Sequence, residues 1–320
     1  VSRAAQQLDM AAVRERASLV ARLPGAPPPD VVALLYLANP LTFAACVGLS
    51  AGAFENAALL GALGAACALR TSVAGALAAL AAAVGVQPVL AAPALALLAA
   101  VGPWGHGEDE RVAESGAAAR ASGSAQPATA ATLRRGMLSF VLWFALASAA
   151  LAGAARALMA DAPGGALPAA RAIAGHALLG EELEPNLGMW WYFNVEVFDH
   201  SRSFFLVVFH AQPLLVLAPL LIRLRKRPLV AAFACITLMG AYRPHPTASD
   251  VALPLALLPL LASRLANFRF GSTLCLAYGL AVLGVPLTWR AWRVMGIANS
   301  NLYYAATLAA GGAQGLMLIE

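Results

Sequence analysis

The chain has 320 residues, of which 61% are hydrophobic and only 12% are charged. A soluble domain usually carries about 25% charged residues. This number of charged residues is too small to cover the surface of a soluble enzyme of this size. A soluble protein is therefore excluded, and the bilayer is the solvent for most of the chain. The net charge of +5 is assigned to Arg residues that anchor cytosolic loops, and not to nucleic-acid binding. The four cysteines form no CxxC pair, so a zinc site or a disulfide framework is not expected.

Residues 1–30 are polar and contain several Arg, and they end in the Pro-rich run LPGAPPPD. We expect a cytosolic polar segment here. Because the chain starts at Val1 and shows no signal peptide, we also expect a fragment that lacks its true N-terminus. Residues 31–320 are predicted to form a single transmembrane domain, an all-α polytopic bundle of about ten spans. The expected spans are Val31–Ser50, Ala57–Leu69, Ser72–Val86, Pro88–Pro103, Gly136–Leu158, Ser203–Ile222, Pro228–Tyr242, Asp250–Arg264, Phe270–Trp289 and Leu302–Ile319.

Two polar stretches interrupt this series. Residues 104–135 are rich in Gly, Ser and Ala and are predicted to be a cytosolic loop. Residues 159–202 are predicted to be a loop on the opposite, luminal face that contains an interfacial helix. With a cytosolic N-terminus and ten spans, 15 of the 21 Lys and Arg residues fall on the cytosolic side. This asymmetry agrees with the positive-inside rule. The same topology places four polar motifs on the other face, namely EELEPN, FDHSRS, YRPHPTASD and GIANSN.

The densest aromatic stretch is EPNLGMWWYFNVEVFDHSRSFF, from Glu184 to Phe205. A continuous helix would place Tyr192, Glu196 and His200 on one face, at i, i+4 and i+8, and Trp191, Val195, Phe198 and Arg202 on another. This pattern is typical of an aromatic belt at the water–lipid boundary. The alternative is a platform for a lipid head group or acyl chain. Glu196 and His200 are not expected to bind a metal, because no third ligand is evident.

The other motifs also have a structural and a functional interpretation. In RPHPTASD, either Asp250 or Thr247 is expected to cap the following helix, or the segment forms a polar wall of a cavity. In GIANSN, Asn299 and Asn301 either cap a helix or donate and accept hydrogen bonds to a sugar or phosphate. In YLANP, Pro40 is expected to break the first apolar segment, and a structural kink is favoured over a binding role.

Taken together, EPNLGMWWYFNVEVFDH, HPTASDVAL and IANSNLYYA resemble the PIG-U family, the polytopic subunit of glycosylphosphatidylinositol (GPI) transamidase. The stretch VVALLYLANPLTFAACVGLS also resembles that family. The resemblance covers residues from about 30 to the end, with a weak patch at 104–178. It implies a fold related to the GT-C mannosyltransferases, location in the endoplasmic-reticulum membrane, and no catalysis, cofactor or metal of its own.

The resemblance further implies that the chain binds and presents the GPI lipid, beside other subunits that include a caspase-like cysteine protease. Carried onto this chain, Asn299 and Asn301 would contact the GPI glycan or phosphate, and Asp250 would support the cavity. Glu196 and His200 would hydrogen-bond at the membrane surface. The lipid would be walled by Trp191, Tyr192, Phe193 and Phe198.

Two other classes of membrane protein, a mannosyltransferase and a transporter, would show different features in the sequence. A GT-C mannosyltransferase that uses dolichyl-phosphate mannose would carry an acidic luminal motif soon after its first span. That region is expected to lie upstream of this fragment, so this alternative stays open. The run EDE at Glu108–Glu110 falls on the cytosolic side in this topology. A transporter would need charged residues at the centres of the spans, and none is evident there.

Overall fold

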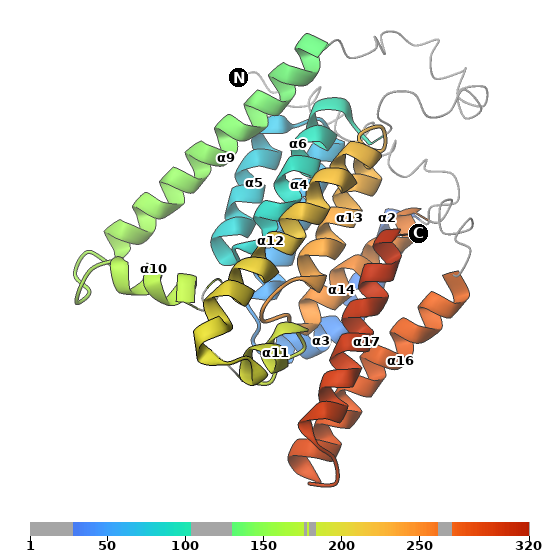
Figure 1. Cartoon of the computed structure of the whole chain (residues 1–320). Helices are drawn as coiled ribbons and strands as arrows, with labels where there is room; N and C mark the ends of the chain where they lie inside the picture. Colours follow the sequence, from blue (N-terminus) through green and yellow to red (C-terminus); the bar gives the residue numbers. More distant parts are fainter. Residues whose placement is uncertain (1–27, 104–129, 176–177, 179–183, 262–270, 320) are drawn as a thin grey trace.

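The structure is a computed structural model that describes residues 28–103, 130–175, 178, 184–261 and 271–319 (Figure 1). All regular secondary structure within these ranges is helical. The elements are α2 (Pro29–Leu37), α3 (Pro40–Val47), α4 (Gly52–Cys67), α5 (Thr71–Val84), η1 (Gln87–Ala91), α6 (Ala92–Val101), α9 (Ala130–Leu158), α10 (Leu167–Ala174), α11 (Trp190–Glu196), α12 (Asp199–Leu224), α13 (Pro228–Ala241), α14 (Ala248–Leu257), η3 (Leu258–Leu261), α16 (Gly271–Trp289), η4 (Arg290–Val294) and α17 (Ser300–Ile319). The all-α prediction is therefore confirmed. The assignments for residues 1–30 and 104–135 lie largely outside the described residues, although α9 already begins at Ala130.

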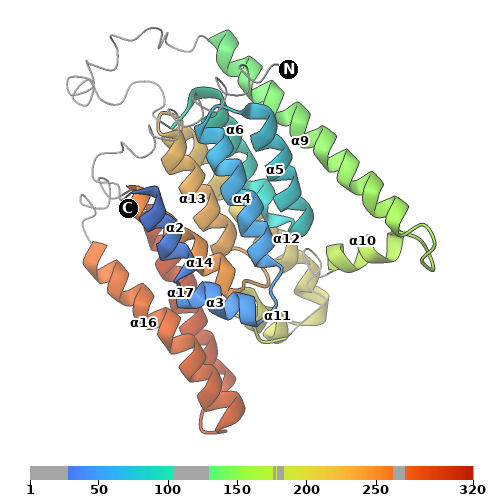
Figure 2. The same ribbon diagram turned by 180° about the vertical axis from the view of Figure 1, so that it is seen from behind.

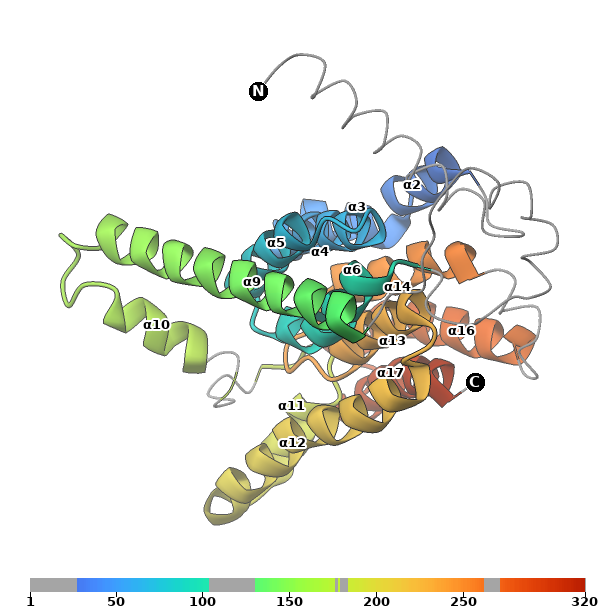
Figure 3. The same cartoon turned by 90° about the horizontal axis from the view of Figure 1, so that it is seen from above.

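The centre of the bundle is built by α4, α5, α6 and α13, with α9 and α12 on the outside (Figures 1 and 3). Helix α13 is buried along almost its whole length, as expected for a helix that is apolar on every face. Small side chains allow the helices to approach closely. A Cβ atom built at Gly75 in α5 would lie 2.5 Å from the carbonyl oxygen of Phe140 in α9. Helices α16 and α17 pair as a hairpin that extends beyond the other helices at one end (Figure 2).

The two ends of the bundle carry different loops. The turns between α4 and α5 and between α12 and α13, which carry Arg70 and the basic run 223–227, lie at one end (Figures 1 and 2). Helix α11, the loop 243–247 and the turn between α16 and α17 lie at the other. The aromatic motif, RPHPTASD and GIANSN are thus gathered at one end, as the predicted topology requires.

The apolar segments are helical, but most of them are short. Among the residues that the structure describes, three helices are long and apolar enough to cross a membrane: Ala130–Leu158, Asp199–Leu224 and Ser300–Ile319. Helices α2 and α3 make a fourth if they count as one span bent by 51°. A 14-residue helix such as α13 is about 21 Å long, which is less than the roughly 30 Å of a hydrocarbon core. By length and composition, the described residues therefore contain three or four candidate spans, and the expected ten are not confirmed.

The break between α2 and α3 has the local cause that the YLANP motif predicts. Pro40 is the first residue of α3, and Asn39 caps that helix by accepting a hydrogen bond of 2.9 Å from the N–H of Leu41. Proline is favoured at the first position of a helix, where its missing N–H costs nothing. The kink in this segment is confirmed.

The continuous interfacial helix expected over the aromatic motif is wrong. Helix α11 ends at Glu196, Val197 is extended (ψ 134°), and α12 starts at Asp199. Tyr192 and Glu196 therefore lie on one helix and His200 on the next. The i, i+4, i+8 face does not form, because the chain changes direction at Val197 and Phe198.

Candidate functional site

The three motifs at this end of the bundle hold one another through long-range hydrogen bonds. The hydroxyl of Tyr303 donates to the carbonyl oxygen of Asn186 at 3.1 Å, and that of Tyr304 donates to the carbonyl oxygen of Met189 at 2.8 Å. Both tyrosines belong to the first turn and a half of α17, which begins at Ser300 within GIANSN. The segment before α11 is thereby fixed against α17, over a separation of more than a hundred residues.

Trp191 is the centre of the aromatic cluster at this contact. It is only 4% exposed, and its ring lies 5.9 Å from those of both Tyr303 and Tyr304 and 6.3 Å from that of Trp292. Aromatic pairs at such separations stabilise by about 0.5–1.5 kcal/mol beyond their burial. Its indole Nε1 has no hydrogen-bond partner among the described residues. Trp191 is thus a packing centre that fixes α11 on α17.

A cavity of about 510 Å³, here called the apolar cavity, opens beside this cluster. It lies between α3, the segment before α11, the end of α13, α14, α16 and α17. Its wall includes Leu41, Gly240, Val251, Trp289, Ala310 and Gly311. Gly311 makes room for Met189 at this wall, since a Cβ atom there would lie 2.6 Å from the sulfur of that side chain. The polar groups in the wall are few and include Asn186, Tyr303 and Gln314. An apolar cleft with a few polar groups is the usual form of a small-molecule site.

Sequence reasoning did not find this cavity. Of the aromatic residues expected to wall a lipid, Trp191 packs behind Tyr303, and Phe193 packs on Phe205 and Phe209 of α12. Phe198 is 76% exposed and stacks on His200. Most of the residues that do form the wall are small or aliphatic, and they come from five helices, the segment before α11 and the loop 243–247. Such residues carry no local signature in a chain this rich in alanine.

The two asparagines of GIANSN have different partners. Asn299 accepts a hydrogen bond of 3.0 Å from the N–H of Leu302, which is the bond that an N-cap residue makes to α17. Asn301 accepts a hydrogen bond from the hydroxyl of Tyr192. Both asparagines are exposed. The structure thus brings Tyr192 and Asn301, predicted from separate motifs, into direct contact.

Glu196 and His200 are exposed and lie on different helices. Neither lines the apolar cavity. Within the described ranges, no three His, Cys, Asp or Glu side chains are grouped so that they could hold a metal ion.

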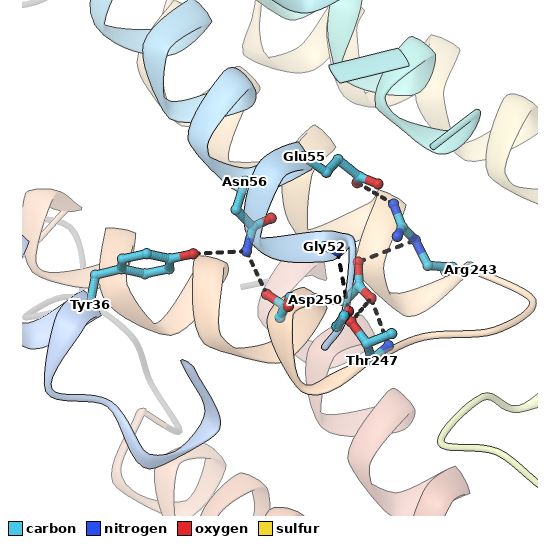
Figure 4. A network of polar contacts seen from close by, with 9 residues as sticks. Tyr36, Gly52, Glu55, Asn56, Arg243, Thr247 and Asp250 are labelled. Carbon is cyan, nitrogen blue, oxygen red and sulfur yellow. Dashed lines mark hydrogen bonds and ion pairs between the residues drawn. The ribbon is translucent and has the colours of Figure 1, made fainter. Parts of the chain in front are cut away.

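Asp250 lies in a buried network of charged groups (Figure 4). Thr247 is the N-cap of α14 and forms a capping box with Asp250, whose Oδ2 accepts from the Thr247 N–H at 2.7 Å. Of the two expected capping residues, Thr247 is therefore the N-cap. The Oδ1 of Asp250 lies 3.2 Å from Nε of Arg243, and Arg243 also pairs with Glu55 at the start of α4.

This network stabilises the positive charge of Arg243. Burial alone would lower the pKa of Arg243, but the carboxylates of Asp250 and Glu55 outweigh it and keep that pKa above its ordinary value. Sequence reasoning missed Glu55 and its partner Arg243, which lie 188 residues apart. The signal available was an acid in the apolar run AGAFENAALL. Such an acid is rarely buried without a partner.

A second cavity, of about 500 Å³, lies against this network and is here called the charged cavity. Glu55 and Arg243 line it, together with residues of the α5 C-terminus, α10 and the loop 243–247. The loop separates the two cavities. Pro246 and Ala248 line the apolar cavity, whereas His245 and Thr247 line the charged cavity.

Comparison with known proteins places the chain in a family. The family described as "GPI transamidase subunit PIG-U" matches residues 3–310. The chain is 33% identical over 149 residues to the GPI-anchor transamidase component PIGU of Homo sapiens and to that of Cricetulus griseus, which is 47% of this chain and 34% of each relative. It is 30% identical over 148 residues to the GPI transamidase component GAB1 of Saccharomyces cerevisiae, or 46% of this chain and 38% of that protein. The chain thus spans about a third of the length of these relatives in the matched region. The match over nearly the whole chain shows that the chain belongs to the PIG-U family of GPI transamidase subunits.

Proposed function

We propose that this chain is a non-catalytic subunit of GPI transamidase that binds the GPI lipid in the apolar cavity and presents it for attachment to protein C-termini. The observation that carries the proposal is the position of the cavity. It opens at the end of the bundle where the three motifs converge, and its wall is apolar with few polar groups. An acyl chain fits such a wall, because burying each methylene contributes about 0.8 kcal/mol.

In this proposal, some of the predicted site residues contact the lipid and others support the site or face the membrane surface. Asn299 and Asn301 are exposed next to the cavity end of α17, where their amide groups can bind a sugar or a phosphate. Trp191, Tyr192 and Phe193 support the lipid site from behind, while Phe198 and His200 face outwards with Glu196 towards the membrane surface. Asp250 supports the loop that forms part of the cavity wall.

The proposal also covers the setting of the chain. We place it as a multi-pass protein of the endoplasmic-reticulum membrane, with a GT-C-like bundle in which the short helices complete about ten spans. The motif-bearing end is then luminal, and the basic end is cytosolic, in accord with the positive-inside rule. The cysteine nucleophile of the transamidation belongs to a separate caspase-like subunit, with which this chain assembles. The relatives are named as transamidase components, which gives no support to a mannosyltransferase.

A pair of neighbouring alanines on α17 tests lipid binding. Ala310 lines the apolar cavity, and Ala309 is exposed on the outside of the same helix. In the full-length subunit, within the purified complex, Ala310→Trp fills the cavity and is expected to lower co-purified GPI at least tenfold. Ala309→Trp adds the same ring outside the cavity and is expected to leave bound GPI unchanged. Equal GPI in the two variants, with assembly intact, would overturn the proposal.

A further inference from the structure

The buried network that borders the charged cavity has an excess of negative charge, and two of its members, Glu55 and Arg243, line the cavity. Two carboxylates, those of Glu55 and Asp250, face one guanidinium, that of Arg243 (Figure 4). Glu55 is 2% exposed and Asp250 is 3% exposed. Buried charges are stabilised by partners, and a carboxylate left over in a buried site favours a cation beside it.

The two carboxylates differ in how many of their oxygens have a hydrogen-bond or ion-pair partner. Asp250 uses both oxygens, one with Arg243 and the other with the N–H and the hydroxyl of Thr247. Glu55 pairs through Oε1 with Arg243, and its Oε2 has no hydrogen-bond partner among the described residues. Gly85 leaves space at this oxygen, since a Cβ atom there would lie 2.2 Å from Oε2. Glu55 and Gly85 both line the charged cavity, so the free carboxylate oxygen is at its wall.

The remaining lining is suited to a small polar organic group. Ser50, Gln87 and Thr247 bring hydroxyl and amide groups to the wall, and Gln87 is half-buried. A volume of about 500 Å³ lies in the range of small-molecule sites. A metal ion is a poor fit, because the described residues bring no group of three metal-binding side chains together. A primary ammonium suits the site better, because its three N–H donors can be shared between a carboxylate and neutral oxygens.

We propose that the charged cavity binds a primary ammonium group of the lipid head group, with the Oε2 of Glu55 as its principal acceptor. This inference rests on the proposed function, since it assigns the head group of the lipid whose acyl chains occupy the apolar cavity. The two cavities are back to back across the loop 243–247, so one amphiphile can reach both. The ammonium can belong to an amino sugar or to an ethanolamine phosphate.

The test compares lipids that differ only in the charge on the amine. The purified full-length complex is titrated with glucosaminyl phosphatidylinositol and with its N-acetylated form. It is also titrated with phosphatidylethanolamine and N-acyl phosphatidylethanolamine. The wild type is expected to bind the free amine of one pair about tenfold or more tightly than the acylated form, as a hydrogen bond to a charged group allows. The pair that shows the preference identifies the source of the ammonium.

Glu55→Gln is expected to abolish this preference and to leave binding of the acylated lipid unchanged. The matched control is Glu184→Gln, which removes the same charge from an exposed acid that lines neither cavity. If the wild type binds amine and acylated forms equally, the inference fails and the proposed function stands. If it binds neither, the proposed function fails. The wild-type comparison needs no variant, so it decides the question even if Glu55→Gln does not assemble.

Discussion

Asn186 and His245 connect the two cavities. The Nδ2 of Asn186 lies 3.2 Å from the Nδ1 of His245, and Asn186 lines the apolar cavity while His245 lines the charged cavity. Asn186 also folds its own segment, because its Oδ1 accepts a hydrogen bond of 2.6 Å from the N–H of Gly188. The segment before α11 and the loop 243–247 are therefore fixed to one another by a side chain that faces both.

A double-mutant cycle measures this connection. Asn186→Ala removes the turn and the contact to the loop, whereas His245→Ala removes the contact and leaves the turn at Gly188 in place. We expect a coupling energy of about 0.5–1.5 kcal/mol between the two changes, as found for residues in direct contact. The readout is the free energy of unfolding of the full-length subunit in mixed micelles. Strict additivity would show that the two segments are stabilised independently.

Asn301→Ala is expected to lower GPI attachment without lowering the abundance of the subunit. The side chain is exposed and bonds to the hydroxyl of Tyr192, so its loss costs little stability but removes an amide at the cavity end of α17. Tyr192→Phe removes only the hydrogen bond and is expected to have a smaller effect. The measurement is surface display of a GPI-anchored reporter, normalised to immunoblotted subunit. A fall of abundance in proportion to attachment would make Asn301 a packing residue only.

Asn299 is expected to act differently, because it caps α17. Asn299→Ala should destabilise the subunit by roughly 0.5–2 kcal/mol, and Asn299→Ser should restore most of that loss. If Asn299 also contacts the lipid head group, Asn299→Ser will restore the melting temperature but not GPI binding. Full recovery of both by serine would restrict Asn299 to capping.

Much of this end of the molecule was predictable from the chain itself. Hydropathy located every described helix of the bundle core, and the distribution of Arg separated the two ends, because both signals depend on local composition. That topology places Tyr192 and Asn301 at the same end of the bundle, but it does not specify their direct contact, which the structure shows. The break at Val197 was not predictable, because Val197 and Phe198 fit a helical face as well as they fit an extended link.

The two cavities could not be predicted from local sequence patterns. Glu55 and Arg243 are 188 residues apart, and their pairing depends on how α4 packs beside the loop that follows α13. The shape of the apolar cavity depends on Gly240 and Gly311, which have no side chains. Because glycine and alanine occur throughout this sequence, these two positions do not stand out in it. Short helices added a further difficulty, since a 14-residue apolar run indicates a helix but does not indicate how it meets the membrane.

Arg243→Leu is expected to be strongly destabilising. The change leaves two carboxylates that are each at most 3% exposed as side chains without their cation. Breaking a buried pair by removing one partner costs about 3–5 kcal/mol. Glu55→Gln should be milder, because Arg243 keeps Asp250. Thermal unfolding of the detergent-purified complex compares both variants with the wild type. An Arg243→Leu protein that melts at the wild-type temperature would show that the network does not stabilise the loop 243–247.

The packing of α9 on the bundle gives the last prediction. Gly75 is buried, and the nearest atom to a Cβ built there is the Phe140 backbone carbonyl oxygen, at 2.5 Å. Backbone cannot move aside as the end of a flexible side chain can, so Gly75→Ala must push α5 and α9 apart. We expect the free energy of unfolding to fall by about 1–3 kcal/mol.

Gly64 in α4 is the matched control, because a Cβ there meets nothing within 4 Å. Gly64→Ala is expected to be neutral or to stabilise by up to about 1 kcal/mol, since alanine favours the helix. Thermal unfolding of both variants in detergent decides the matter, and a Gly75→Ala protein as stable as Gly64→Ala would show that α9 does not pack on α5 at this distance.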